Sequence, residues 1–550
     1  MTDAKSTRGA DQLVSGLRAA GVDVIFSLSG NQIMPVYDAL LDSGIRLIHT
    51  RHEGAAVYMA EAYAQVTGRV GVALLTAGPG FANGLSAAWS ALSSETPILI
   101  LSGDAPMNRD GHGAFQEMEQ TALAKSAVKA TYRAHSAATL GQDVLNAIAI
   151  AKAHRRGPVH IALPDDLLRE DTKSGSGAKP SVQMPGDRLP STLSDTCRDA
   201  LVAALKSARQ PIALAGPAFR RAATKPGLEA FTQRTGIPAI ALESPRGLRD
   251  PRLGAFAEVL PKADLLITFG KPLDFMLGFG EASALAPECK IFQIDTDEAI
   301  MTVDRERLAD RSIVSGFACP EQMLAVLTSA HDGHEIPAAR REWCKSVLSA
   351  VAYRPPEWAT MNQTSGRLHP VTVAAGISSV LSAHPKASLI IDGGEFGQWS
   401  QACLDTERSV INGPSGAIGG GIPYAIAAKA ANPDQPAIVM MGDGTAGFYL
   451  AEFETALRND LPIVAIIGND AKWNAEHQIQ ARDYGPNRTH SCELSETRFD
   501  LVITALGGHG EYVTNPSELA PALERALASG KAACINIELE GLAAPAVKRA

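Results

Sequence analysis

Short apolar runs alternate with longer amphipathic stretches along residues 1–172. The apolar runs read DVIFSL, IRLIHT, VGVALLTAG, PILILSG and GPVHIAL. Runs of this length bounded by turn residues predict buried strands, and the amphipathic stretches between them predict helices. Because strands that alternate with helices pair in parallel, this block is expected to form a parallel sheet covered by helices.

The same alternation returns in residues 190–345 and 366–541. The second block contains PIALAG, IPAIAL, ADLLITFG and CKIFQID, and the third contains ASLIIDGG, PAIVMMGDG, LPIVAIIGND and ACINIELEG. Between the blocks lie REDTKSGSGAKPSVQMPGDRLP and VAYRPPEWATMNQTSGRLHP, which have no periodicity and are typical of linkers. The predicted fold class is therefore α/β, with three open parallel-sheet domains and helices on both faces of each sheet.

Composition and charge narrow the functional classes. The 550 residues carry a net charge of −9 at a pI of about 5.8, so nothing favours binding to nucleic acid or to an anionic membrane. No apolar run reaches about 18 residues, and the N-terminus lacks the apolar core of a signal peptide. The seven cysteines are scattered without metal-ligand spacing, as is typical of free thiols. We expect a cytoplasmic protein that acts on small molecules.

The third block places acidic residues at the ends of two consecutive predicted strands. Asp443 follows PAIVMMG between two glycines, and Asp470 ends LPIVAIIGND. Since neighbouring parallel strands end at the same edge of a sheet, both carboxylates are expected to bind one hard cation such as Mg²⁺. The helix predicted from about Thr445 offers free N–H groups to a phosphate. The alternative is that each acid only caps the helix that follows it.

This arrangement resembles the binding motif for thiamine diphosphate (ThDP): Gly442, Asp443 and Gly444, then 24 residues, then Asn-Asp. Most relatives end the motif with Asn-Asn, and Asp470 still offers an oxygen in that place. The resemblance implies a Mg²⁺ ion held by Asp443, Asp470 and the backbone carbonyl of Lys472. It also implies coenzyme contacts from the residues around the metal loop, namely Gly442, Gly444, Thr445, Trp473 and Asn474.

The first block contains a candidate for the acid that ThDP chemistry requires. Glu53 lies in IRLIHTRHEGAAVYMAEAYAQVTG, and this stretch resembles the RHE-containing segment of acetolactate synthases. The resemblance implies that Glu53 hydrogen-bonds to the aminopyrimidine of ThDP, which then takes the proton from C2 of the thiazolium. A dry pocket favours this role, because burial raises the pKa of a carboxyl group. The alternative is a glutamate that only stabilises the N-terminus of its helix.

Further stretches resemble coenzyme-binding and reacting-centre segments of the same family. GPSGAIGGGIP implies that Ile418 supports the bent coenzyme and that the carbonyl of Gly416 receives its amino group. DGGEFGQWS places Glu395 and Phe396 near the diphosphate or, alternatively, in an ordinary turn. GNQIMPVYDAL, TAGPGFANGL and GHGAFQEMEQ supply the remaining residues of the first block. They are the coenzyme-binding Gly30 and Gly80, the catalytic Asn31, Gln32 and Gln116, and the substrate-facing Phe115.

The substrate region departs from the acetolactate synthase pattern. Ile479 stands where those enzymes use Trp to select their acceptor. Glu476 and His477 are expected beside it, with His477 either an acid/base group near neutral pH or a solvated helix residue. In the central block Pro272 replaces the Arg that lies along the flavin, which argues against FAD. Asp295 either binds the ribose or the base of an adenosine, as in ADP, or belongs to a vestigial dinucleotide fold.

The resemblance covers nearly the whole chain and divides it into pyrimidine-binding (1–172), central (190–345) and diphosphate-binding (366–541) domains. The leading hypothesis is a ThDP- and Mg²⁺-dependent carboligase or lyase of the acetolactate synthase, benzaldehyde lyase and 2-hydroxyacyl-CoA lyase superfamily, closest in motif to acetolactate synthase. It acts on 2-oxo acids or 2-hydroxy ketones through a C2 carbanion.

Two alternatives remain open. KPLDFMLGFG resembles the central domain of oxalyl-CoA decarboxylases and 2-hydroxyacyl-CoA lyases, although the chain ends without the extended tail of the CoA lyases. The second alternative is a non-catalytic homologue. Because family members place the site between two subunits, we expect a homodimer or homotetramer.

Overall fold

The computed structural model describes residues 7–172, 179–184, 192–331, 333, 335–361 and 366–549. It contains three parallel sheets, each within one of the predicted blocks, and a short antiparallel pair of β1 (Thr7–Arg8) and β8 (Asp171–Thr172). The predicted fold class, three parallel-sheet α/β domains, is therefore confirmed. Parts of both predicted linkers lie outside the described residues.

The first sheet is apolar on both faces, since its strands are continuous apolar runs. Its order is β3-β2-β4-β5-β7-β6, and all neighbours are parallel. Because successive side chains point to opposite faces, Leu74 packs toward α1 and α7, whereas Leu75 packs toward α3 and α5. The elements are β2 (Val24–Ser27), β3 (Arg46–His49), β4 (Gly71–Leu75), β5 (Ile98–Asp104), β6 (Ala130–Arg133), β7 (Val159–Pro164), α1 (Gly9–Ala19), α2 (Met34–Leu40), α3 (Glu53–Thr67), α4 (Pro79–Asn83), α5 (Leu85–Ser93), α6 (Gln120–Ala124), α7 (Leu140–Lys152) and α8 (Asp165–Arg169).

The third sheet repeats the strand order of the first. Its order is β15-β14-β16-β17-β19-β18, so both sheets read 2-1-3-4-6-5 when strands are counted along their own domain. Helices α14, α15 and α21 cover one face, and α16, α18 and α20 cover the other. The elements are β14 (Ser388–Ile391), β15 (Arg408–Ile411), β16 (Ala437–Gly442), β17 (Ile463–Asn469), β18 (His509–Val513), β19 (Ala533–Glu538), α14 (Pro370–Leu381), α15 (Gly394–Cys403), α16 (Gly421–Ala431), α17 (Asp443–Ala446), α18 (Glu452–Arg458), α19 (Asn474–Tyr484), α20 (Phe499–Ala505) and α21 (Leu519–Ala528).

The central domain has a smaller sheet of five parallel strands in the order β10-β9-β11-β12-β13. Its C-terminal helix runs to Ala352, past residue 345, and buries Trp343 against the sheet. No helix of the described residues is both long and apolar enough to cross a membrane. The elements are β9 (Pro211–Ala215), β10 (Ala239–Ala241), β11 (Leu265–Phe269), β12 (Lys290–Asp295), β13 (Ile313–Phe317), α9 (Asp195–Ser207), α10 (Lys225–Thr235), α11 (Glu298–Arg307), α12 (Pro320–Ser329) and α13 (Ala338–Ala352).

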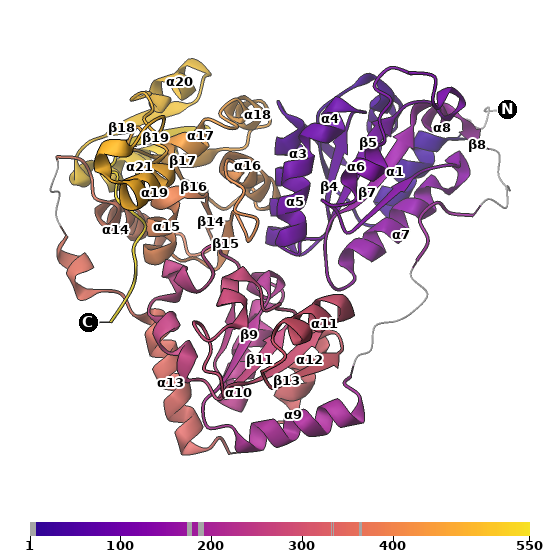
Figure 1. Ribbon diagram of the computed structural model, residues 1–550. Helices are drawn as coiled ribbons and strands as arrows, with labels where there is room; N and C mark the ends of the chain where they lie inside the picture. Colours follow the sequence, from indigo (N-terminus) through magenta and orange to yellow (C-terminus); the bar gives the residue numbers. More distant parts are fainter. Residues whose placement is uncertain are drawn as a thin grey trace.

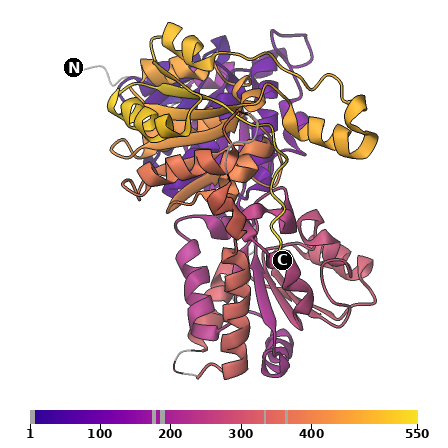
Figure 2. The same cartoon turned by 90° about the vertical axis from the view of Figure 1, so that its left-hand side faces the viewer.

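The first and third domains lie side by side, with the central domain below them (Figure 1). Helix α3 of the first domain packs directly on α16 of the third, and one apolar core includes residues of both. Tyr424 lies inside this contact and donates a 2.7 Å hydrogen bond to the buried carboxylate of Glu61. The C-terminal segment leaves the third domain and runs down to the central domain (Figures 1 and 2).

Candidate active site

Two carboxylates meet at the carboxyl edge of the third sheet. Strands β16 and β17 are parallel neighbours whose register pairs Gly442 with Gly468. Asp443 directly follows the first strand and Asp470 directly follows the second, so both acids leave the sheet at the same edge. The helix expected from about Thr445 begins at Asp443 itself and lasts four residues.

The acid pair forms no ion pair among the described residues, and the positive charge that acts on Asp470 is that of Lys472. Asp443 is 5% exposed, and its Oδ2 atom is buried without a hydrogen-bond partner. Burial raises the pKa of Asp443 to about 6, and burial together with the charge of Asp443 raises the pKa of Asp470 to about 7. Two carboxylates held this close repel each other unless a cation or a shared proton lies between them.

The donors of this edge suit Mg²⁺, which prefers carboxylate, carbonyl and phosphate oxygens. Among the described residues no group of three or more acidic, His or Cys side chains is placed to hold a metal ion, so the two carboxylates would supply the protein's side-chain ligands. The backbone N–H of Lys472 lies close to both carboxyl groups and partly offsets the rise in their pKa values. A ligand role for the carbonyl of Lys472 remains a prediction.

A small cavity of about 90 Å³ surrounds the acid pair. All of the lining side chains come from the third domain. Twelve residues predicted for the coenzyme, metal or substrate line it: Glu395, Phe396, Ile418, Gly442, Asp443, Gly444, Thr445, Asp470, Lys472, Trp473, Asn474 and Glu476. Trp473 packs against Gly444, where a Cβ atom would lie only 2.7 Å from its ring.

The loop that carries Ile418 is positioned by Asp392, a residue for which the sequence predicted no role. The Asp392 carboxylate accepts hydrogen bonds from the backbone N–H groups of Gly393, Gly419 and Gly421, at 2.6, 3.1 and 2.9 Å. Ile418 lines the cavity as a consequence. The only sequence signal for this role was the position of Asp392, directly after an apolar run and directly before two glycines.

The C-terminal segment lies against this cavity. Asn474 donates to the carbonyl of Leu542 at 3.0 Å, and Ala544 donates from its N–H to Glu395 at 3.0 Å. Arg246 of the central domain donates to the same Glu395 oxygen at 2.8 Å. Glu395 therefore connects the tail and the central domain at the cavity wall, which no pattern in the sequence indicated.

Glu53 lies at the corresponding edge of the first sheet. It begins α3, is 8% exposed, and accepts a 3.0 Å hydrogen bond from Asn83 Nδ2. Gly80 is required beside it, because a Cβ atom there would lie 3.0 Å from Glu53 Oε1 and 2.4 Å from Thr76 Cγ2. Thr76 also donates to the buried Gln32 at 3.0 Å.

Gln116 reaches this edge on a strained loop. Its φ angle is +61°, in the left-handed region, and its carbonyl would lie 2.8 Å from a Cβ atom at Gly78. Glu117 holds the loop by accepting N–H groups from Gly111, Gly113 and Ala114 at 2.5, 2.8 and 3.0 Å. These bonds lower the pKa of Glu117, a residue that the sequence analysis left without a role.

Within one chain the two halves of the predicted site, at Glu53 and at the acid pair, do not share a cavity. Among the described residues, none from the first domain lines the cavity at Asp443 and Asp470. Several predicted site residues do not line this cavity. They are Glu53 and the residues around it described above, together with Gly30, Asn31, Gly416, His477, Ile479 and Phe115. Phe115 and Ile479 are 73% and 45% exposed, and His477 Nδ1 is buried without a hydrogen-bond partner.

A separate cavity of about 660 Å³ lies between the first and central domains, at the carboxyl edge of the central sheet. Asp295 at this edge is fully buried and bound by Arg155 at 2.6 Å and by the N–H groups of Thr296 and Asp297. Its carboxylate is therefore engaged within the chain. The charges of the cavity wall balance, since they come from Lys129, Arg155, Arg156, Glu95, Asp297 and Glu298.

The fold and the carboxyl edges of its sheets define an α/β protein. One sheet carries an acid pair at its edge, and a second sheet with the same strand order carries a buried glutamate. A family model described as thiamine pyrophosphate enzyme, N-terminal TPP binding domain, matches residues 7–123, and its C-terminal TPP binding domain counterpart matches residues 392–537. Thiamine pyrophosphate is another name for ThDP. The chain belongs to the thiamine pyrophosphate enzymes.

Curated relatives agree over the full length. The chain is 31% identical over 532 residues to the acetolactate synthase large subunit IlvG of Mycobacterium tuberculosis, covering 95% of this chain and 94% of the relative. It is 28% identical to 2-hydroxyacyl-CoA lyase 2 of Danio rerio, covering 98% and 92%, and 29% identical to that of Caenorhabditis elegans, covering 96% and 88%. The predicted superfamily is confirmed.

Proposed function

We propose that this enzyme is a Mg²⁺-dependent carboligase or lyase that acts on 2-oxo acids or 2-hydroxy ketones, in the manner of acetolactate synthases. The observation that carries the proposal is the unpartnered Oδ2 of Asp443 beside Asp470, in a chain of the thiamine pyrophosphate family. A divalent cation would remove the repulsion between the two acids and bind a diphosphate. The M. tuberculosis relative supports the substrate class through its name.

The residues of the third domain would bind and orient ThDP. Asp443 and Asp470 would hold a Mg²⁺ ion, which would supply positive charge for a diphosphate, and Ile418 would supply an apolar support on the same cavity wall. When bound, ThDP supplies a carbon acid whose deprotonated form attacks carbonyl groups. Trp473 and Phe396 exclude water from the cavity wall.

Glu53 would hold the proton that the aminopyrimidine exchanges. Its pocket fits this role because Asn83 fixes one carboxylate oxygen and Gly80 leaves room beside the other. Since one chain keeps Glu53 outside the cavity of Asp443, we propose that a second copy supplies it and that the active unit is at least a homodimer. The exposed Phe115 and Ile479 suit such an interface.

Calorimetry of ThDP binding tests the metal site. We expect binding with Mg²⁺, none with EDTA, and none in the variant Asp443→Asn, because a neutral amide cannot replace the charge that holds the ion. Asp434→Asn, at an exposed position of the same domain, is the matched control. If ThDP binds equally well without Mg²⁺ and in the variant Asp443→Asn, the protein is a ThDP-fold homologue that lacks this chemistry.

Subunit mixing tests the shared site. Glu53→Gln and Asp443→Asn are each expected to be inactive, whereas a randomly reassembled equal mixture recovers about one quarter of the wild-type sites, since each mixed dimer has one intact site. A mixture as inactive as its components contradicts the shared site. The reaction itself is identified by screening 2-oxo acids and acyloins and reading product masses.

A second candidate function is a 2-hydroxyacyl-CoA lyase, as two of the relatives are named. The cavity of about 660 Å³ beside the central sheet favours it by size. The balanced charges of its wall and the engaged Asp295 count against a nucleotide diphosphate, whether in FAD, ADP or coenzyme A. Inhibition by free coenzyme A or ADP would select this candidate, and indifference to both would reject it.

A further inference from the structure

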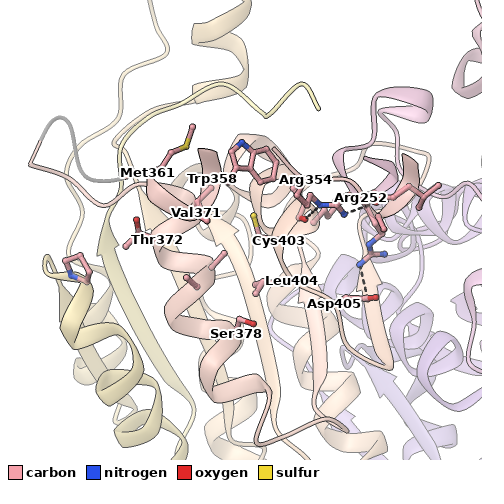
Figure 3. Close-up of a pocket in the computed structure, with 18 of the residues that line it drawn as sticks. Arg252, Arg354, Trp358, Met361, Val371, Thr372, Ser378, Cys403, Leu404 and Asp405 are labelled. Carbon is pink, nitrogen blue, oxygen red and sulfur yellow. Dashed lines mark hydrogen bonds and ion pairs between the residues drawn. The ribbon is translucent and has the colours of Figure 1, made fainter. Parts of the chain in front are cut away.

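A large groove lies between the central and third domains, away from the coenzyme cavity. Its volume is about 1110 Å³, and it shares no lining residue with the cavity at Asp443. Helix α13 and the short helix η10 (Pro356–Thr360) form one side, and α14 and the C-terminal end of α15 form the other. Figure 3 shows its residues from both sides facing a common space.

One part of the groove is an apolar wall. Trp358 and Met361 approach from the linker side, while Val371 and Leu404 belong to the third domain (Figure 3). Three alanines of α14 and α15 and the thiol of Cys403 complete this surface. Binding becomes more favourable when such a wall covers the apolar body of a ligand, because apolar surface is removed from water.

The other part of the groove is cationic. Arg220, Arg252 and Arg354 line it, and Asp405 is the single acidic residue among the described lining residues. Asp405 is 69% exposed and lies 3.9 Å from Arg252, so it neutralises that charge only weakly. Behind the lining, the buried Glu243 pairs with Arg220 at 3.5 Å, and the buried Asp250 accepts the backbone N–H of Arg252. The described lining residues thus carry three positive charges and one negative charge next to the apolar wall, and Glu243 behind the lining offsets the charge of Arg220.

Two side chains in the groove leave hydrogen-bonding groups unused. Arg252 is mostly buried, and its Nε atom has no partner. Gln401 on α15 is 1% exposed, and neither the oxygen nor the nitrogen of its amide has a partner. Buried polar groups are nearly always hydrogen-bonded, so two such residues lining one groove indicate a missing ligand.

Arg354 has a different role in the same cluster. It donates to four backbone carbonyls, those of Ala402, Val351, Tyr353 and Arg252, at 2.6 to 3.0 Å. These bonds join the end of α15 to the end of α13 and fix the walls of the groove. Its charge is not balanced by an ion pair among the described residues, so it adds to the field that an anion would meet.

From these contacts we propose that the groove binds an amphipathic carboxylate, with its head at Arg252 and Gln401 and its apolar chain along Trp358 and Leu404. A guanidinium binds a carboxylate through paired N–H donors, and the unpartnered Nε of Arg252 is one such donor. The Gln401 amide supplies another donor to the head. This site is independent of the proposed reaction, because none of its residues lines the coenzyme cavity.

Calorimetry of the full-length protein with sodium decanoate tests the proposal, and decan-1-ol serves as the neutral probe of equal chain length. We expect decanoate to bind at least about tenfold more tightly than decanol, because only the anion engages the arginines. Arg252→Gln should reduce this preference about tenfold, whereas Arg198→Gln at an exposed position of α9 should not. Equal affinity for both probes overturns the carboxylate assignment, and so does decyl phosphate binding more tightly than decanoate.

A steric variant keeps the test valid if Arg252→Gln fails to fold. Ala375 lines the groove from an exposed position of α14, so Ala375→Phe fills the space without entering the core. We expect it to weaken decanoate binding at least about tenfold, while Ser379→Phe, exposed on the same helix outside the groove, leaves binding unchanged. The ring centroid of Trp358 lies 5.2 Å from that of Trp399, with the rings tilted by 53°, so binding should also change tryptophan fluorescence. Unaltered affinity in Ala375→Phe overturns the site.

Discussion

The first and third domains share one strand order and carry different chemistry at the same edge. In the first, Glu53 is a single acid whose neighbour Asn83 is neutral and hydrogen-bonded to it. In the third, Asp443 and Asp470 adjoin each other, and an oxygen of the pair has no partner. The common topology supplies two equivalent edges, and the loops after the strands decide whether an edge suits a proton or a metal ion.

The largest expected effect comes from replacing an acid by its amide in one domain at a time, because this separates the proton role of the first domain from the metal role of the third. Glu53→Gln should slow proton exchange at C2 of bound ThDP by about 10²–10⁴, since it removes the acid/base group and leaves the metal site intact. NMR of deuterium exchange measures the rate, and calorimetry should show nearly unchanged binding of ThDP and Mg²⁺. An exchange rate equal to that of the wild type would remove Glu53 from this role.

Low pH should selectively weaken metal binding at the carboxyl edge of the third sheet. Burial raises the pKa of Asp443 to about 6 and that of Asp470 to about 7. Since both groups must be ionised to bind Mg²⁺, the affinity for ThDP and Mg²⁺ should fall up to about tenfold per pH unit between pH 7 and 6, and up to about a hundredfold per pH unit below pH 6, where two protons compete with the ion. Calorimetry between pH 5 and 8 measures this, at about half-unit steps. A flat profile would show that the acids do not bind the ion.

The same pKa values set the stability of the metal-free protein. A carboxyl group whose pKa is raised on folding costs stability as pH rises from its unfolded value, about 4, to its folded value, and adds no further cost above it. The metal-free protein should therefore lose stability between about pH 4 and 7 at this pair. Asp470→Asn should flatten that part of the profile in thermal melts, whereas Asp434→Asn should not.

Glycines at the two edges should differ in their tolerance of a methyl group. Gly80→Ala places a Cβ atom 2.4 Å from Thr76 and 3.0 Å from Glu53, and should lower the free energy of unfolding by about 1–3 kcal/mol. At Gly442 nothing lies within 4 Å of the added atom, so Gly442→Ala should stay within about 0.5 kcal/mol. Melts of the two metal-free variants test this contrast, and equal shifts would refute it.

The smallest effect is expected at Glu117, which supports the Gln116 loop from outside the site. Glu117→Gln weakens its three N–H hydrogen bonds and should lower kcat about two- to tenfold, because the loop no longer holds its strained conformation. ThDP affinity should stay unchanged, since the third domain supplies those contacts. A loss of ThDP affinity with unchanged kcat would contradict the positioning role.

Local patterns in the sequence were enough to predict the three sheets and the acids at their strand ends. Apolar runs specify buried parallel strands, and a residue directly after such a run must lie at the carboxyl edge, so Asp443, Asp470 and Glu53 followed from their positions. The motif resemblance then predicted the family, which the family models and the relatives confirm.

Only the tertiary structure decided which residues meet across long separations. Asp392 holds a loop 27 residues away, Glu395 joins the C-terminal tail to Arg246, and the groove at Arg252 forms where two domains pack. The separation of Glu53 from the cavity of Asp443 within one chain also emerged only there. Strand and helix periodicity reports which face of an element is buried, but the partner of that face depends on how the domains pack, which no local pattern encodes.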